Sequence, residues 1–222
     1  MNPLITIITP TIGRESIFKL IDSIDYQDTN KMVRHLIITD DGTKFKDDIK
    51  PENSKHRNII NIPGNLGKPY GTNLRAIALM TVDTPWVGFA DDDVWWDSSH
   101  IEIIEDIIKR PNVEWGAVRR TVHNPLTNNV IGYDDFESVG PSEDRKVPYE
   151  MFDGNCMFFK KEHGFNAAHL YRNTDQYNDD RLMYSYLKSS NISYVFSNEH
   201  TVNQVCPVNL IGMFEKHCTK FD

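Results

Sequence analysis

The stretch Phe89-Ala90-Asp91-Asp92-Asp93-Val94-Trp95-Trp96 places three adjacent carboxylates directly after a short apolar run, residues 86–90. The apolar run is typical of a buried β-strand. Carboxylates crowded at the end of a strand repel one another and cost stability unless a positive charge lies between them. A divalent cation such as Mg²⁺ or Mn²⁺ suits hard oxygen ligands, and a bound cation in turn binds a diphosphate. The stretch therefore indicates an enzyme that handles a nucleotide diphosphate.

The composition is that of an ordinary globular protein. The 222 residues are 39% hydrophobic and 25% charged, which allows one large domain or two small ones with a real core. The net charge of -8 argues weakly against a nucleic-acid backbone as the main partner. Cys156, Cys206 and Cys218 show no paired spacing, which is typical of reduced thiols. Because no signal peptide or apolar run of ~20 residues is present, we expect a cytoplasmic protein without a transmembrane segment.

Strands and helices alternate in the first half of the chain. Apolar spacing predicts helices over residues 15–24 and 71–80, and Ser99 with Glu102 has the spacing of a capping box that opens a third helix. Such alternation implies a parallel sheet with crossover helices, whose ligands bind at the carboxyl ends of the strands. The polar clusters that follow the strands should therefore gather along one edge. The predicted strands are 4–9, 35–39, 57–62 and 86–90, and the clusters are 9–14, 40–42, 65–68 and 91–93.

The second half is less regular. Strands are predicted at 115–122, at 154–161 and, as a last short strand, at 193–196. Residues 124–148 are polar and turn-rich, which indicates a surface loop or a hairpin. A helix is predicted over 181–188. No repeat or linker divides the chain.

Six polar segments follow one another in a fixed order between residue 4 and about residue 190. They are 7–14, 38–43, 65–73, 89–95, 154–166 and 178–180. Together these segments resemble those of the GT-A glycosyltransferases, and of family 2 in particular. The resemblance implies an α/β fold with a central, mostly parallel sheet flanked by helices. It also implies a single domain, 1–222, in which residues 1–98 bind a nucleotide sugar and residues 99–222 bind the acceptor.

The resemblance implies a nucleotide-diphosphate sugar as donor, with a UDP-sugar favoured. Asp41 would accept a hydrogen bond from the N3–H of uracil, although Asp-Asp-Gly is also common in ordinary turns. Gly67 would permit close approach of the backbone to the diphosphate, and Lys68 would offset its charge. A lone loop lysine is more often simply solvated. The implied donor-binding residues are Pro10, Thr11, Arg14, Glu15, Asp41, Asn65, Gly67, Lys68, Asn73, Asp91 and Asp92.

The acidic triplet would also bind the metal, Mn²⁺ or Mg²⁺. Alignment of the family pattern from Phe89 pairs Asp91 with Asp93, whereas alignment from Trp95 pairs Asp92 with Asp93. Asp93 is common to both and is the first metal ligand, with Asp91 as the second. His200 would complete the shell, as a late histidine does in some relatives, although a lone histidine is more often structural.

Asp179 and Asp180 are the candidates for the general base. Transfer with inversion needs a carboxylate that takes the proton of the acceptor hydroxyl. The alternative is that an aspartate caps the helix over 181–188. The family pattern places the base second in the acidic pair, which favours Asp180. The acceptor could be a glycan, a lipid-linked sugar, a protein or a small molecule.

Three rival functions are open. A nucleotidyltransferase of similar fold would carry a Gly-rich, basic phosphate loop after the first strand, where this chain has only Gly13 and Arg14. A non-catalytic nucleotide-sugar binding module would lack the metal or base carboxylates, and both sets are present. A glycosyltransferase that modifies nucleic acid is disfavoured by the net charge of -8. The sequence thus predicts a metal-dependent glycosyltransferase whose sugar and acceptor it does not identify.

Overall fold

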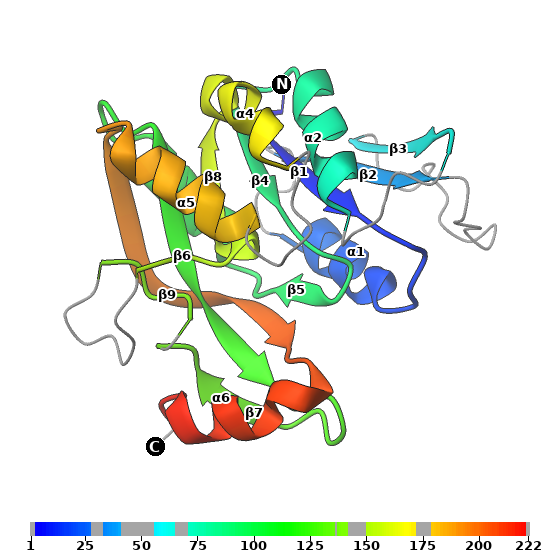
Figure 1. The fold of residues 1–222 in the computed structure, drawn as a ribbon, viewed down its shortest axis with the longest axis vertical. Helices are drawn as coiled ribbons and strands as arrows, with labels where there is room; N and C mark the ends of the chain where they lie inside the picture. The colour runs from blue at the N-terminus through cyan, green and yellow to red at the C-terminus, as the bar shows by residue number, and fades with distance from the viewer. Residues whose placement is uncertain are drawn as a thin grey trace.

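In the computed structural model, the residues that the structure describes form a mixed sheet of nine strands (Figure 1). The structure describes residues 3–27, 33–40, 56–64, 71–135, 137–141, 150–171 and 179–220. The strand order is β3-β2-β1-β4-β8-β6-β9-β5, with β7 paired to β6. The strands are β1 (Ile5–Pro10), β2 (Val33–Asp40), β3 (Arg57–Ile62), β4 (Trp86–Phe89), β5 (Val94–Trp96), β6 (Trp115–His123), β7 (Val130–Tyr133), β8 (Met157–Lys160) and β9 (Tyr194–Val205).

The helices cover the sheet and close the core. In Figure 1, α2, α4 and α5 lie together over one face, and α2 contacts α4 while α4 contacts α5. The α-helices are α1 (Ile17–Asp25), α2 (Thr72–Thr81), α3 (His100–Ile108), α4 (Lys161–Ala167), α5 (Asp179–Ser189) and α6 (Ile211–His217). The 3₁₀ helices are η3 (Gly154–Cys156), η4 (Ala168–Tyr171) and η5 (Val208–Leu210).

The first half follows the prediction from the sequence. Strands β3, β2, β1 and β4 are parallel neighbours, and every residue of β1 is buried, as expected for a parallel strand with both faces covered. In α1 the buried residues are the four apolar ones of the helical spacing, Ile17, Leu20, Ile21 and Ile24. The predicted capping box is wrong. The Ser99 backbone is already helical, and its side chain caps no backbone N–H.

The second half shows why the sheet is mixed. Strand β8 runs antiparallel to both β4 and β6. Strand β6 forms a hairpin with β7, and only β7 and the turn before it lie in the segment predicted as a loop or hairpin. The strand predicted at 193–196 continues to Val205 as β9. Strand β9 pairs with β6 along its length, with two register shifts, and its residues 202–204 also pair with β5 on the other side. Its polar second part therefore remains a strand through backbone pairing rather than apolar patterning.

The three cysteines are all buried and form no disulfide. Cys156 belongs to the main core, whereas Cys206 and Cys218 pack with Phe214 in a small cluster under α6. Burial raises the pKa of each of these thiols. Among the described residues, no helix is both long and apolar enough to cross a membrane.

His35 on β2 is a buried, neutral histidine. Its Nε2 lies 2.9 Å from the Thr9 hydroxyl, and its Nδ1 accepts a hydrogen bond from Arg57 Nε at 3.3 Å. Burial, and then the charge of Arg57, lower the pKa of His35 from 6.5 to about 3. Between these two values the unfolded chain holds one more proton than the folded chain, so acid favours unfolding.

We therefore expect His35→Gln to make the protein less sensitive to acid. Between pH 7 and pH 5 the wild type should lose about 2 kcal/mol more of its free energy of unfolding than the variant does. Urea unfolding at the two pH values measures this difference. His169, which is exposed, provides the control: His169→Gln should lose as much as the wild type. Equal losses in the wild type and His35→Gln would contradict the buried neutral state.

Candidate functional site

The carboxyl ends of β1 and β4 bring two of the predicted polar clusters together. Because β1 pairs in parallel with β4, Ile8 lies opposite Phe89 and the loops that follow start side by side. The Thr11 hydroxyl donates a hydrogen bond to Asp92 Oδ2 at 2.6 Å. The Arg14 guanidinium donates to Asp92 Oδ1 at 3.2 Å and to Asp93 Oδ2 at 3.3 Å. Asp92 is therefore engaged through both of its oxygens.

Asp93 has an oxygen without a partner. Its Oδ1 is buried and accepts no hydrogen bond from any described residue. Burial, and then repulsion from Asp91 and Asp92, raise the pKa of Asp93 to about 7, against the opposing effect of Arg14. A buried carboxylate oxygen that is held among like charges is a fitting ligand for a hard divalent cation.

Arg75 lies between the carboxylates that follow β4 and those at the start of α5. It stands in the first turns of α2 and forms one ion pair with Asp91 and another with Asp179, whose Oδ2 lies 3.1 Å from the guanidinium. Burial opposes the charged form of Arg75, but the surrounding carboxylates outweigh it and raise the pKa of this side chain. One arginine therefore links the end of β4 to the start of α5.

Asp180 faces the same centre from the next position of α5. The helix begins at Asp179, two residues earlier than predicted, so both aspartates lie in its first turn, where the helix dipole favours acids. A Cβ at Gly154 would collide with Asp180 Oδ1, so the backbone at 154 has to approach without a side chain. Burial, and then the charges of Asp153 and Asp179, raise the pKa of Asp180 well above its ordinary value. A carboxylate in this setting is suited to taking up a proton.

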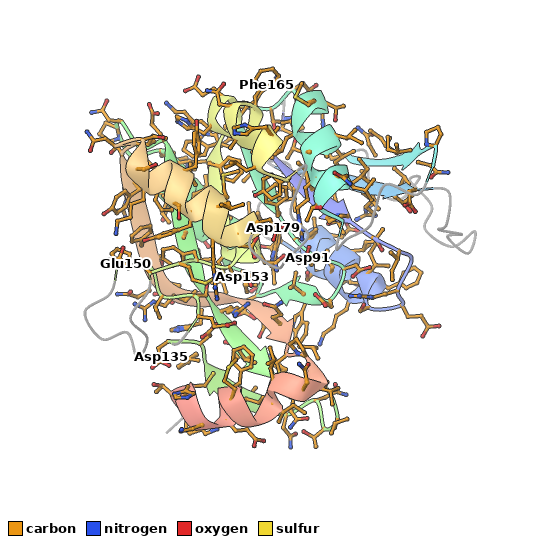
Figure 2. All side chains as sticks on the ribbon, in the orientation of Figure 1. Asp91, Asp135, Glu150, Asp153, Phe165 and Asp179 are labelled. Carbon is orange, nitrogen blue, oxygen red and sulfur yellow. The ribbon has the colours of Figure 1, made fainter. Side chains whose placement is uncertain are left out.

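Asp153 and Asn155 also belong to this site, although the sequence patterns did not identify them as candidates. Figure 2 shows Asp91, Asp153 and Asp179 gathered between α5 and β5, whereas the labelled Asp135 and Glu150 lie apart from them. Asn155 bridges Asp91 and Asp153 by hydrogen bonds. The available signal was Asp153 as the cap of a short helical turn, a position favoured by aspartate.

Similar solved structures identify the fold. TarS 1–349 from S. aureus matches with a TM-score of 0.69 and 15% identity, over 92% of this chain and 60% of that chain. The same protein in complex with UDP-GlcNAc matches with a TM-score of 0.66 and 16% identity, over 93% and 59%. The chain has the GT-A fold.

A third similar structure comes from another organism. The mannosyltransferase PcManGT from Pyrobaculum calidifontis, in complex with GDP-Man and Mn²⁺, matches this GT-A chain with a TM-score of 0.61 and 18% identity. The match covers 93% of this chain and 57% of that one, so the chain spans about 60% of the length of these three structures. No protein-family model and no curated protein matches the sequence. At these identities the likeness shows the GT-A fold alone.

The other residues that the sequence predicts to bind a donor lie as follows. Pro10 ends β1 and lies against Gly71, where an added Cβ would come within 2.9 Å of the proline ring. Glu15 is exposed in the loop before α1, and Asn73 is half-buried in the first turn of α2. Four predicted residues lie outside the described part of the chain, namely Asp41, Asn65, Gly67 and Lys68.

The structure does not bring His200 to the acidic triplet. Strand β5, which follows Asp93, has Val94 opposite Gln204. His200 lies four residues before Gln204 in β9, which corresponds to about 13 Å of strand. The His200 ring instead stacks on Tyr133, with ring centroids 3.9 Å apart. Burial and the charge of Arg119 lower the pKa of His200 to about 4. Sequence position alone could not show this, because it does not reveal how far β9 extends.

A second possible ligand cluster lies at the opposite end of β4. Among the described residues, Glu114, Glu162 and His163 have ligand atoms within 4.8 Å of one another. Glu114 already pairs with His163 at 2.7 Å and with Lys160 at 3.2 Å. Because Lys160 and His163 already engage both carboxylate oxygens of Glu114, the cluster does not need a metal ion.

We expect Arg75→Met to destabilise the protein strongly, because it leaves Asp91 and Asp179 facing each other without a cation. The loss in free energy of unfolding should be about 3–5 kcal/mol, as for other buried ion pairs that lose one partner. Urea unfolding at pH 7 measures it. The control is Arg34→Met, which breaks a surface pair with the exposed Asp83 and should cost under about 1 kcal/mol. Equal losses would contradict the central role of Arg75.

Proposed function

We propose that this protein transfers a sugar from a nucleotide-diphosphate donor to a hydroxyl acceptor, in a metal-dependent reaction that inverts the anomeric carbon. One observation carries the proposal: the carboxylates at the end of β4 and those at the start of α5 meet at Arg75. An acidic, metal-suited cluster beside a separate carboxylate of raised pKa is what a glycosyl transfer to a hydroxyl requires.

A UDP-sugar is the favoured donor. The support is twofold: the resemblance of the segment around Asp41 to a uracil-binding loop, and the similarity of the fold to that of TarS, which has been solved with UDP-GlcNAc and with UDP. The similar fold of PcManGT, solved with GDP-Man, makes a GDP-sugar the alternative.

The residues present fit Mn²⁺ or Mg²⁺. Asp93 would hold the metal through its unpartnered Oδ1. Asp92 is engaged by Thr11 and Arg14, and Asp91 by Arg75, so these two carboxylates are oriented for the ribose or the sugar. A bound metal ion supplies positive charge that offsets the charge of the leaving diphosphate. PcManGT, of similar fold, has been solved with Mn²⁺.

Asp180 is the general base in this proposal. Asp179 is held by Arg75, whereas the Asp180 carboxylate accepts no hydrogen bond from any described side chain. As the acceptor oxygen bonds to the anomeric carbon and the diphosphate leaves, the hydroxyl proton passes to the Asp180 carboxylate. The raised pKa of Asp180 makes it a stronger base than an exposed aspartate.

Binding of the donor is tested by thermal shift. We expect one of UDP, GDP, dTDP and CMP to raise the melting temperature, and to do so only with Mn²⁺; a ligand at 100 times its Kd adds about 2.7 kcal/mol. Asp93→Asn should abolish the shift. Asp106→Asn, an exposed acid on α3, is the matched control and should retain it. If no nucleotide stabilises the wild type, the donor-site proposal fails.

The base is tested separately from donor binding. Asp180→Asn should keep the thermal shift with Mn²⁺ and the chosen nucleotide, but should lower kcat by about 10²- to 10⁴-fold. The rate of release of the nucleoside diphosphate in the presence of acceptor measures kcat. Asp179→Asn should lose less, because Asp179 serves as a partner of Arg75 and not as the proton acceptor. A larger loss in Asp179→Asn than in Asp180→Asn would reverse the assignment.

A further inference from the structure

Asn155 reaches from the acceptor half of the chain to a donor-side carboxylate. It lies in η3, directly before β8, and is 5% exposed. Its Oδ1 accepts a hydrogen bond from the backbone N–H of Asp91 at 2.6 Å, and its Nδ2 donates to Asp91 Oδ2 at 3.3 Å. The side-chain amide thus holds both the backbone and the carboxylate of the first aspartate of the triplet.

The orientation of this amide follows from its partners. The backbone N–H of Asp91 is a donor, so it has to face Oδ1 of Asn155 rather than Nδ2. The Nδ2 group then faces two acceptors, Asp91 Oδ2 and Asp153 Oδ1, the latter at 2.8 Å. An aspartate at position 155 would have the same shape but no donor for either carboxylate. The arrangement therefore requires an amide and not merely a small polar side chain.

Asp153, which is paired with Arg120, holds Asn155 in place. Asp153 Oδ1 also accepts the backbone N–H of Asn155 at 2.9 Å, and the other oxygen of Asp153 pairs with Arg120. Arg120 is buried on β6 and also pairs with Asp134 at 2.6 Å. A continuous line of polar contacts thus runs from the buried Arg120 through Asp153 and Asn155 to Asp91. Because each group in this line has a partner, rotation of the Asn155 amide would break at least two hydrogen bonds.

We propose that Asn155 is a positioning residue, which holds Asp91 in the geometry that donor binding needs while Asp153 and Arg120 hold Asn155. The proposal rests on the proposed glycosyl transfer and adds to it a residue from the acceptor half. Asp91 Oδ1 is held by Arg75 and Oδ2 by Asn155, so both oxygens are fixed before the donor arrives. Preorganisation of this kind lowers the cost of binding and of reaching the reactive geometry.

The test compares Asn155→Asp with the wild type. The substitution keeps the shape, removes both hydrogen bonds donated by Nδ2, and adds a third carboxylate beside Asp91 and Asp153. We expect kcat/KM for the donor that the nucleotide panel selects to fall by about 10- to 100-fold, the usual effect of losing a hydrogen-bonding partner in the outer shell of a metal site. The rise in melting temperature caused by that nucleoside diphosphate with Mn²⁺ should shrink accordingly.

Asn203→Asp is the matched control. Asn203 on β9 is also buried, and its Nδ2 donates to the carboxylate of Asp97 at 2.8 Å. This control therefore suffers the same chemical change next to a carboxylate, outside the line of contacts that leads to Asp91. It should show a comparable fall in the melting temperature of the unliganded protein, but unchanged kcat, KM and nucleotide shift.

Asn155→Ala, which adds no charge, is the second variant if Asn155→Asp does not fold, and it should lower kcat/KM by about tenfold.

A second comparison asks whether Asn155 acts through Asp91. In the Asp91→Asn background, Asn155→Ala should cause little further loss of kcat/KM, because the residue it positions has already been changed. If the two losses simply add, Asn155 does not act through Asp91.

If the kinetics of Asn155→Asp equal those of Asn203→Asp, the positioning role is overturned while the proposed function stands. A wild type that binds no nucleotide would overturn the proposed function, and this inference with it.

Discussion

Arg75 is the constraint on which the geometry of the site depends. Its positive charge offsets the negative charges of Asp91 and Asp179, which would otherwise repel each other in this partly buried site. A guanidinium does not lose its proton in the working range of proteins, so Arg75 keeps its positive charge at every pH at which the chain is folded. Its two-pronged shape suits two carboxylates at once, which an ammonium group could not match. The ends of β4 and α5 are thereby held at one place in the fold.

The topology of the sheet makes that meeting possible. Strand β4 is parallel to β1 on one side and antiparallel to β8 on the other. A parallel neighbour places its own carboxyl end beside that of β4, whereas an antiparallel neighbour places its amino end there. Residues that precede β8, including Asn155, therefore come to lie beside the residues that follow β4. The change from parallel to antiparallel pairing at β4 unites segments some 60 positions apart, as the hydrogen bond between Asp91 and Asn155 shows.

The sequence predicted the structural features that depend on local patterns of apolar and polar residues. The apolar runs of β1, β2 and β4 and the helical spacing of α1 identified a parallel half-sheet, and the polar residues after β1 and β4 do meet. It could not predict pairings between distant elements. The length of β9 depends on partners in β5 and β6, and the place of His200 depends on that length. The bridging role of Arg75 depends on where α5 begins, which the helical pattern gave only to within two residues.

Because all three cysteines are buried, their reaction with a thiol reagent reports local opening of the structure. A thiol that is enclosed and of raised pKa reacts with alkylating reagents only when the surrounding structure opens. Cys156 follows Asn155 directly, whereas Cys206 and Cys218 lie in the separate cluster under α6. The rates at which the two groups become labelled would therefore measure, in one unmodified molecule, how often the structure around Asn155 opens relative to the cluster under α6.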